Sequence, residues 1–365
     1  MNQDIKYYGL INQGATCYLN SILQVLFMTR EFREAVKRCP KENGDINVQL
    51  NVLFEDLKRN TAESTKVTEK LGIEKVYEQQ DAGHYLEKIL SLVSDEASQI
   101  FRGELIHRTI CGECRSHTED DVPFLFLSLP LMVSKNGNFS VDDGIQEFLK
   151  DAEFCGEDQL YCDHCEDNRD TTVKYKLQHH PEILILLLKR FEYNYNHMSY
   201  SKDSRPVDVC YTINLPENQT YEMYAMVDHF GTLRGGHYTA TIKPEEEESW
   251  YEFNDSSVTL LGNQMFQGKF EKSRSAHLLF YRKQSIGLQN EGQDEEEGQR
   301  DLAANHNLIV ELDQRPERTC WYQNNYVVIS LPSSTGFCEA SICTVICNGV
   351  ANGVTQLKNR IFSWF

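Results

Sequence analysis

The stretch Asn12-Gln13-Gly14-Ala15-Thr16-Cys17-Tyr18-Leu19-Asn20 is the most informative part of this 365-residue chain, because it places a cysteine where a turn gives way to a helix. The apolar residues that follow have the spacing of one buried helical face, which predicts a helix over Cys17–Met28. A cysteine at a helix start lies near the positive end of the helix dipole. We therefore expect a lowered thiol pKa and a reactive thiolate at Cys17. For an isolated cysteine, burial in a core would be the simpler interpretation.

A distant segment supplies partners for a nucleophilic thiol. It contains Gly235-Gly236-His237-Tyr238, followed by Trp250-Tyr251-Glu252-Phe253-Asn254-Asp255. A nucleophilic cysteine needs a base, and the base needs a third group to hold its ring. His237 supplies the base, and Asn254 the orienting amide, with Asp255 as a second candidate. Both flanks have strand-like composition, so these side chains should converge on the helix that begins at Cys17.

Together, these segments resemble the signature boxes of the ubiquitin-specific proteases, papain-like cysteine peptidases that cut ubiquitin from proteins. Gln79-Gln80-Asp81-Ala82-Gly83-His84-Tyr85-Leu86 resembles the second box of the family, and Leu188-Lys189-Arg190-Phe191 resembles the end of its central strand. The resemblance runs from Tyr7 to Lys283, with the motifs in the family's order.

The resemblance implies specific catalytic roles. Cys17 attacks the carbonyl carbon of the terminal glycine of ubiquitin, His237 transfers the proton, and Asn254 orients His237. Asn12 matches the side chain of the family's oxyanion hole, and an amide N–H is chemically suited to that role. Without the resemblance, Asn12 would be interpreted as a turn residue. Asp255 matches a second polar residue that orders this region.

The implied fold is α+β: a papain-like fold with a helical thumb at about 7–102, β-rich zinc-binding fingers at about 101–176 and a mixed β palm at about 180–283. Predicted helices are Cys17–Met28, Val48–Asn60, Asp81–Val93 and Val141–Lys150. Predicted strands are Phe124–Val133, Ile183–Phe191, Tyr221–Phe230, Tyr238–Lys243, Trp250–Asn254 and Ala276–Tyr281. Tyr193 to Leu215 is interpreted as a polar excursion between strands.

The paired glycines before His237 suggest a special backbone. Gly235 and Gly236 permit positive φ and let a substrate backbone approach closely. In the family, the Gly-Gly end of ubiquitin passes through a narrow channel here. A simple hairpin turn explains the same residues, and the two interpretations are compatible.

Two Cys-x-x-Cys knuckles, Cys111-Gly112-Glu113-Cys114 and Cys162-Asp163-His164-Cys165, form a second strong motif. The pair predicts a tetrahedral zinc site with Cys111, Cys114, Cys162 and Cys165 as ligands and His164 outside it. Such closed sites are structural. A redox function of either knuckle is the weaker alternative. Family members that keep both knuckles bind structural zinc in the fingers.

Composition narrows the choice of partners and compartment. The formal net charge of −19 argues against nucleic acid and suits a substrate with a basic surface, such as the arginine-rich tail of ubiquitin. The N-terminus has no apolar signal core, and no run of ~18 apolar residues predicts a membrane span. A nucleophilic thiol and a thiolate metal site favour reducing conditions, so we expect a cytoplasmic or nuclear protein.

Two features of the second box remain open at the sequence level. Asp81 matches a functional position of the family, and helix capping explains it equally well. His84-Tyr85 stands where the family usually has Glu-Phe. Tyr85 conserves packing, whereas His84 alters a ubiquitin contact or the packing of the thumb.

The C-terminal region is less informative. Residues 284–300 are rich in Gly, Gln and Glu, with Asp294-Glu295-Glu296-Glu297 at their centre, which is typical of an acidic linker. Residues 301–365 contain short strand-like runs, and no fold or function is assigned to them.

Three hypotheses of function remain. The favoured one is a thiol-dependent deubiquitinase acting on ubiquitin and ubiquitinated proteins. The second is a peptidase for a ubiquitin-like modifier, because the recognition surface is diffuse. The third is an inactive ubiquitin-binding scaffold, which the presence of Cys17, His237 and Asn254 disfavours. A secreted papain-like protease is more distant still.

Overall fold

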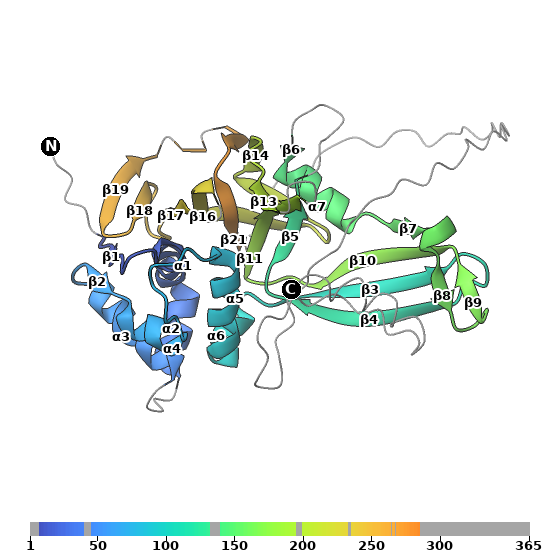
Figure 1. Ribbon diagram of the computed structural model, residues 1–365, viewed down its shortest axis with the longest axis horizontal. Coiled ribbons are helices and arrows are strands. Elements are labelled where there is room, and N and C mark those ends of the chain that lie inside the picture. Colours follow the sequence, from blue (N-terminus) through green and yellow to red (C-terminus); the bar gives the residue numbers. More distant parts are fainter. Residues whose placement is uncertain are drawn as a thin grey trace, which may run out of the picture. The chain divides into compact units, whose positions relative to one another are not determined.

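The computed structural model describes residues 7–39, 45–131, 139–194, 199–232, 235–263, 265–266 and 268–284, all within one compact unit. The acidic linker and C-terminal segment proposed from the sequence (from residue 285 onward) lie outside the described residues. The predicted α+β class is confirmed, because helices dominate the first hundred residues and strands dominate the rest (Figure 1). None of the helices in the described part of the chain combines the length and apolar character needed to cross a membrane.

The N-terminal part is a group of six helices with a short parallel strand pair. They are α1 Cys17–Met28, α2 Arg30–Arg38, α3 Ile46–Leu57, α4 Thr65–Lys70, α5 Ala82–Leu92 and α6 Asp95–Gln99, with β1 Leu10–Ile11 and β2 Ala62–Glu63. The predicted boundaries of α1 are confirmed. Helix α3 begins two residues earlier than predicted because the Asp45 carboxylate caps it, accepting a hydrogen bond from the Asn47 backbone N–H (3.1 Å).

Helix α1 differs from its predicted pattern, since all twelve of its residues are buried rather than one face alone. Some of its buried polar side chains have hydrogen-bond partners, whereas the Tyr18 hydroxyl and the Gln24 Oε1 have none within the described residues. The Gln24 amide donates to the Tyr8 carbonyl, and the Ser21 hydroxyl donates to the Tyr18 carbonyl. Helix α1, which begins at Cys17, is therefore packed on all sides by the other helices and the main sheet.

The main sheet has eight strands in the order β19-β18-β17-β16-β21-β11-β5, with β15 also paired to β16. Its neighbours are antiparallel except for β5 and β11, which run parallel. The strands are β5 Leu127–Pro130, β11 Ile183–Lys189, β15 Thr212–Leu215, β16 Gln219–Thr232, β17 Gly235–Ile242, β18 Trp250–Asn254, β19 Ser257–Gly262 and β21 Ala276–Lys283. Every palm strand predicted from the sequence is present, and the sheet is mixed as predicted.

The two faces of this sheet bury different cores. Tyr238, Ala240 and Ile242 of β17 pack with the N-terminal helices in one apolar cluster. Met226 and Trp250, on β16 and β18, belong to a second cluster on the other side. This alternation is the ordinary consequence of successive strand side chains pointing to opposite faces. It determines which side chains of β16, β17 and β18 can meet.

A separate four-stranded sheet, in the order β4-β3-β10-β7, forms the β-rich middle of the chain. Its strands are β3 Gly103–Cys111, β4 His117–Phe124, β7 Ala152–Phe154 and β10 Thr171–His179, accompanied by the hairpin β8 Leu160–Cys162 and β9 Asp167–Arg169. The remaining elements are β6 Phe139–Ser140, α7 Val141–Leu149, the 3-10 helix Gly156–Asp158, β12 Phe191–Asn194, β13 Ser199–Lys202, β14 Val207–Cys210 and β20 Phe270–Ser273.

Two predictions in this part of the chain need correction. The strand predicted over Phe124–Val133 is broken, because Phe124 ends β4 and β5 covers only Leu127–Pro130; residues 132 and 133 lie outside the described residues. The predicted excursion between Tyr193 and Leu215 contains strands β13, β14 and β15. Its polar composition is compatible with strands because they form small sheets and edge pairs.

Arg190 is the largest fully buried side chain of the described residues. Its guanidinium donates to four backbone carbonyls: those of Ala276 (2.6 Å), Asp203 (3.0 Å), Arg205 (3.0 Å) and Ser273 (3.2 Å). These carbonyls come from the loop after β13, from the last residue of β20 and from the first residue of β21. Arg190 therefore fastens two surface segments to the end of the central strand.

We expect Arg190→Ala to lower the free energy of unfolding by at least about 3 kcal/mol, because four buried carbonyls lose a charged donor. Urea unfolding measures the change. Arg274→Ala is the matched control, since Arg274 is exposed and donates to the Ser204 carbonyl; its effect should stay within about 0.5 kcal/mol. Equal effects of the two variants would contradict the fastening role.

Candidate active site

Cys17 is the first residue of α1, with Thr16 at the N-cap, and its side chain is 1% exposed. The amide of the half-buried Gln79 lies 3.9 Å from the Cys17 Sγ. The Tyr238 backbone also hydrogen-bonds the thiol. The thiol therefore lies where the N-terminal helices meet strand β17, as the sequence predicted.

The predicted lowering of the Cys17 pKa is wrong for this structure. Burial raises the pKa of the Cys17 thiol, and the negative charge of Asp255 raises it further. The hydrogen bonds from the Tyr238 backbone and from Gln79 act in the opposite direction but do not outweigh burial. The helix dipole stabilises a thiolate, but the loss of water around a buried sulfur disfavours the charged form more strongly.

His237 and Asn254 form the predicted pair. The His237 Nε2 lies 2.8 Å from the Asn254 Oδ1, at the ends of strands β17 and β18. The Asn254 carbonyl oxygen can only accept, so Nε2 carries the proton in this contact and the other ring nitrogen, Nδ1, is left as the acceptor. That is the tautomer a general base needs.

Within the described residues, no hydrogen bond joins the Cys17 thiol to the His237 ring; the sulfur contacts Gln79 instead. Catalytic hydrogen bonds often tighten only when substrate is bound. The geometry thus combines an oriented histidine with a thiol that is still protonated and held by its own neighbours.

Asn12, Asn20 and Asp255 form a hydrogen-bonded cluster beside Cys17. The Asp255 carboxylate accepts from the Asn12 Nδ2 (2.9 Å) and from the Asn20 Nδ2 (2.8 Å). The Asn12 Oδ1 accepts from the backbone N–H groups of Gly14 (2.8 Å) and Thr16 (3.1 Å). The turn interpretation of Asn12 is therefore correct. The Asn12 Nδ2 carries two N–H groups. One donates to Asp255, which orients the amide, and the other is the group that the oxyanion role needs.

Gly235 and Gly236 do not use the positive φ that glycine permits. Both residues belong to β17, whereas Gly231, at the other side of the same hairpin, has positive φ (85°). Gly236 is required for another reason, since an added Cβ would lie 2.1 Å from the His229 Nε2. Close packing, rather than a left-handed backbone, explains a glycine directly before His237.

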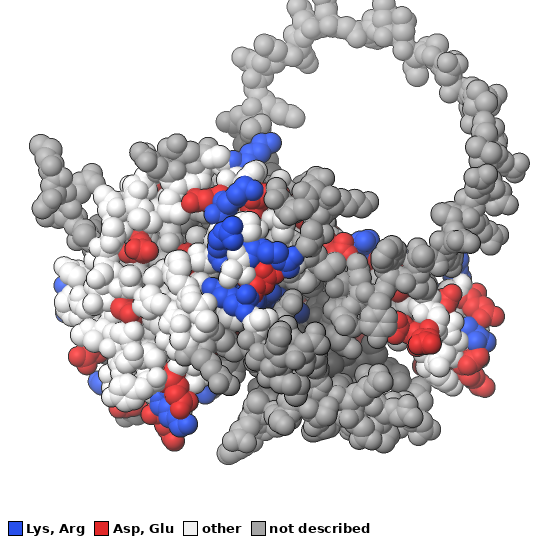
Figure 2. All heavy atoms as spheres, turned by 45° about the horizontal axis from the view of Figure 1, so that its top comes forward, with Lys and Arg blue, Asp and Glu red and all other residues white. Residues whose placement is uncertain are grey.

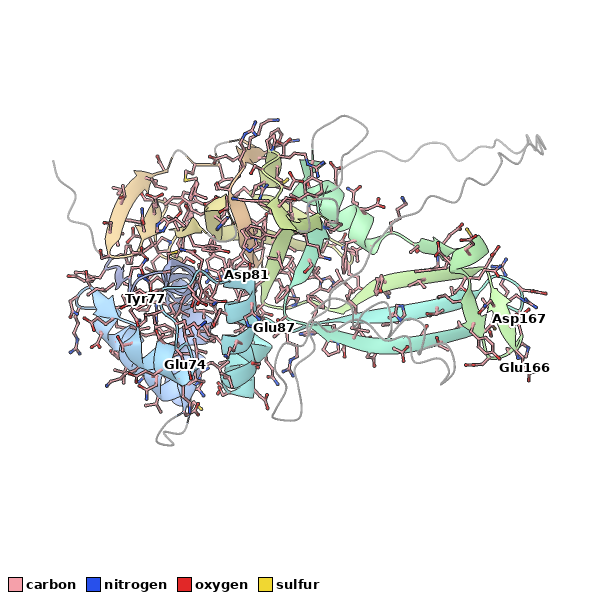
Figure 3. The ribbon with its side chains drawn as sticks, viewed as in Figure 1. Glu74, Tyr77, Asp81, Glu87, Glu166 and Asp167 are labelled. Atoms are coloured by element: carbon pink, nitrogen blue, oxygen red, sulfur yellow. The ribbon has the colours of Figure 1, made fainter. Side chains whose placement is uncertain are left out.

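Asp81 caps α5 by accepting from the His84 backbone N–H (2.9 Å). It also lies 3.1 Å from the Nε2 of the buried His277 on β21. The second contact joins the helical part to the main sheet, and hydrogen bonding and charge from His277 help to lower the pKa of Asp81 despite its burial. The side chain of His84 is exposed. Asp81 is among the residues labelled in Figure 3.

The four predicted metal ligands come together. The Sγ atoms of Cys111, Cys114, Cys162 and Cys165 all lie within 4.8 Å of one another. Cys111 and Cys165 are 3.9 Å apart, and Cys114 and Cys162 are 3.6 Å apart. Four sulfurs at about 2.3 Å from one tetrahedral ion would be separated by about 3.8 Å, so the group fits a single ion.

The local backbone explains how two short motifs make this cluster. Arg115 and Glu166, directly after each knuckle, have positive φ (62° and 52°), which turns the chain back over the sulfurs. The first knuckle follows β3, and the second joins β8 to β9. Glu166 and Asp167 are labelled beside the second knuckle in Figure 3. His164 is exposed and outside the cluster, as predicted.

Some residues of these sites were not predicted. Gln79 lies within the quoted second box, so its position was noted but its contact with the thiol was not. Asn20 has the helical position to reach Asp255, but the period of α1 only marks it as polar. Ser116 lies 3.0 Å from the Cys114 Sγ and 3.5 Å from the Cys162 Sγ. Nothing in the knuckle spacing indicates that contact.

A buried cysteine at a helix start and a histidine hydrogen-bonded to an amide are the residue types that cysteine-type hydrolases use. The family described as ubiquitin carboxyl-terminal hydrolase matches residues 8–281 of this chain. The chain belongs to that family.

Three relatives with the same description share about a quarter of the aligned residues with this chain. Ubiquitin carboxyl-terminal hydrolase 47 of Xenopus tropicalis is 26% identical over 382 residues, covering 76% of this chain and 28% of that protein. Ubiquitin carboxyl-terminal hydrolase 48 of Danio rerio is 26% identical over 365 residues, covering 85% and 34% respectively. The human hydrolase 47 is 24% identical, covering 76% and 27%. The chain spans about a third or less of the length of these relatives.

Because burial raises the Cys17 pKa, alkylation of the free protein by iodoacetamide should be slow at neutral pH and accelerate as pH rises through the raised pKa. Mass spectrometry of the Cys17 peptide from about pH 6 to about pH 10 gives the midpoint, which should exceed the value of about 8.5 for an ordinary thiol. Gln79→Leu, which removes a group that favours the thiolate, should move the midpoint upward. A midpoint below pH 7 would mean that the helix dipole outweighs burial.

Proposed function

We propose that this protein is a deubiquitinase that hydrolyses the isopeptide or peptide bond after the C-terminal glycine of ubiquitin. The observation that carries the proposal is the oriented His237–Asn254 pair at the sheet edge against which Cys17 begins α1, in a chain of the ubiquitin carboxyl-terminal hydrolase family. Ubiquitin and ubiquitinated proteins are the proposed partners.

The first half of the reaction uses Cys17 and His237. The Cys17 proton passes to the His237 Nδ1, and the sulfur attacks the carbonyl carbon of the terminal glycine. The tetrahedral intermediate collapses, the carbon–nitrogen bond breaks, and His237 protonates the leaving amine. The product is a thioester between Cys17 and ubiquitin. Because the free thiol is protonated, binding of the substrate must bring the sulfur and Nδ1 together before proton transfer.

The second half releases ubiquitin. A water molecule gives its proton to the His237 Nδ1 and attacks the thioester carbon, and the sulfur leaves and regains a proton. Asn12 supplies an amide N–H to the oxygen that becomes negative in both steps. Asp255 holds that amide in place (2.9 Å), and Asn254 keeps the imidazole in the required tautomer (2.8 Å).

We further propose the domain roles implied by the family. The helices of residues 7–102 form the thumb, residues 101–176 the fingers and residues 180–283 the palm. The acidic net charge supports recognition of a basic ubiquitin tail. Acidic residues 284–300 would then link the catalytic domain to the segment 301–365.

The metal is proposed to be a single structural Zn²⁺. Four thiolates complete a tetrahedral site and leave no open position for substrate, so the ion would hold the two knuckles together without entering the reaction. The four cysteine ligands and the Cys17 thiol must all stay reduced to function, which supports a cytoplasmic or nuclear location.

A ubiquitin-like modifier is the second candidate substrate, favoured by the exposed His84 in place of the family's usual glutamate. An inactive scaffold is disfavoured by the intact His237–Asn254 contact.

The purified chain should form a covalent adduct with ubiquitin that carries a C-terminal thiol-reactive group, and Cys17→Ala should abolish the adduct. Asn12→Ala should lower kcat by ~10²-fold while leaving adduct formation detectable. The same probe built on ubiquitin-like modifiers is the control. An adduct with such a modifier alone would redirect the substrate, and no adduct with any probe would favour the scaffold.

Elemental analysis should find about one zinc per chain, and Cys162→Ser should reduce zinc content and lower Tm by several degrees, because metal binding contributes to folding. Hydrolysis by the remaining folded protein should persist. The matched control is Cys39→Ser, which changes a thiol outside the cluster. A chain that contains no zinc after purification without chelators would contradict the assignment.

A further inference from the structure

The side chain of Gln79 contacts the Cys17 sulfur but takes no part in the reaction steps described above. Its Nε2 and its Oε1 each lie 3.9 Å from the Cys17 Sγ. Within the described residues, the Gln79 amide makes no other hydrogen bond. Because neither end of the amide is held by a second partner, the amide can follow a change of charge on the sulfur.

The segment that carries Gln79 is fixed on both sides of this residue. The Ala15 N–H, in the turn before α1, donates to the Val76 carbonyl (2.7 Å). On the other side, Asp81 caps α5 and lies 3.1 Å from the Nε2 of the buried His277. Gln79 itself is half-buried and lies outside any helix or strand. Its backbone is therefore held beside the thiol, while its side chain remains free to turn.

The thiol and the thiolate favour different ends of this amide. A protonated sulfur can donate weakly to Oε1, and this donor is lost when the proton passes to His237. Nε2 is then the atom of the amide that can pair with the negative sulfur. The Gln79 contact accordingly acts to lower the pKa of the Cys17 thiol, against the larger effect of burial. Deprotonation of the sulfur thus turns an N–H group of Gln79 toward the reacting atoms.

The distance also suits a donor to the oxygen that becomes negative during the attack. In the tetrahedral intermediate, the sulfur and this oxygen are bonded to the same carbon, so they are closer to each other than the sulfur is to the Gln79 Nε2. A donor to the oxyanion must lie about 2.7–3.1 Å from the oxygen. A nitrogen 3.9 Å from the sulfur meets this requirement when the oxygen forms on the Gln79 side of the sulfur.

We propose that Gln79 is a catalytic residue that donates an N–H to the oxyanion, together with Asn12. The inference rests on the proposed function and adds a second donor to the same step. Asn12 is held by Asp255 (2.9 Å) and by the Gly14 N–H (2.8 Å), so its position is fixed before substrate binds. Gln79 pairs first with the thiolate and then with the oxygen as the negative charge moves there. It keeps both of its N–H protons throughout, because the proton that is transferred moves between Cys17 and His237.

The test compares two reactions of the same thiol. Hydrolysis of ubiquitin that carries a C-terminal fluorophore passes through an oxyanion. With ubiquitin that carries a C-terminal alkyl bromide, the sulfur displaces bromide and no oxyanion forms. Gln79→Leu should lower kcat for hydrolysis by ~10²-fold, the usual effect of losing one oxyanion donor. The rate of alkylation at saturation should fall by about 10-fold at most, because this reaction loses only a hydrogen bond to the thiolate.

The loss should appear in kcat rather than in KM. Figure 2 shows Lys and Arg side chains gathered in one stripe of the molecular surface, with acidic side chains beside them. Gln79→Leu changes no charge, so it leaves this surface and the net charge of −19 unaltered. Attraction of a basic ubiquitin tail is therefore preserved, and KM should stay close to the wild-type value. An interaction made only in the transition state lowers kcat and kcat/KM by the same factor.

The matched control is Gln49→Leu, since Gln49 is a half-buried glutamine on α3 that has no part in the proposed mechanism. Both reactions of this variant should keep their wild-type rates. Gln79→Met, which has a side chain of similar length without an N–H, should behave as Gln79→Leu does and serves if that variant fails to fold.

The outcomes separate this inference from the proposed function. Hydrolysis by the wild-type chain supports the deubiquitinase itself. If the wild-type chain is active, an unchanged kcat in Gln79→Leu would overturn the role of Gln79 alone. Equal losses in hydrolysis and alkylation would also overturn it, because Gln79 would then act only through the thiolate. A wild-type chain that hydrolyses no ubiquitin substrate would overturn the proposed function and this inference with it.

Discussion

The hydrogen bonds of Asp255 join the two segments that carry the residues proposed for catalysis. Its carboxylate binds Asn12 and Asn20, and its backbone carbonyl accepts from the Leu10 N–H (2.8 Å). The Asp255 backbone has a φ of 50°, a conformation that Asp tolerates better than most residues. An added Cβ on Gly9 would lie 2.3 Å from the Asp255 carbonyl oxygen, so only glycine lets the two segments approach this closely. The turn before α1 is thereby fixed to the turn after β18, next to the residue that orients His237.

The same closeness explains the state of the thiol. Cys17 begins a helix whose residues are all buried, so its thiol is shielded from water. This shielding raises the Cys17 pKa more than the helix dipole lowers it. The Asp255 charge that organises Asn12 also disfavours a thiolate nearby. In the proposed mechanism, the Cys17 thiol would stay protonated until a bound substrate brings it to His237, which would limit unproductive reactions of the free thiol.

A feature of the fold or the site could be predicted from the sequence when it depends on residues close together in the chain. The bounds of α1 and β18 follow from local period and composition, and the cluster of four cysteines follows from two short motifs whose Cys-x-x-Cys spacing is typical of ligands to one ion. The direction of the Cys17 pKa shift was wrong because it depends on burial by segments far away in the chain. The close packing of Gly236 was not predicted for the same reason, since the atom that excludes a side chain belongs to His229 on the neighbouring strand. Arg190 was quoted as part of a motif, yet its four carbonyl partners are far from it in the chain, in the loop after β13 and at the adjoining ends of β20 and β21.

The two faces of the main sheet carry different kinds of side chain. Side chains on the helix side, such as Tyr238 and Ala240, are enclosed in an apolar core that holds α1 against the sheet. Side chains on the other side of the same strands include His237 and Asn254 at one end and Thr241 and Glu252 further along. A buried carboxylate such as Asp228 is tolerated on that side because Arg190 offsets part of its charge. Cys17 lies on the helix side, in the same apolar cluster as Tyr238, so the proposed proton transfer requires the His237 ring to meet the sulfur where α1 begins beside the start of β17.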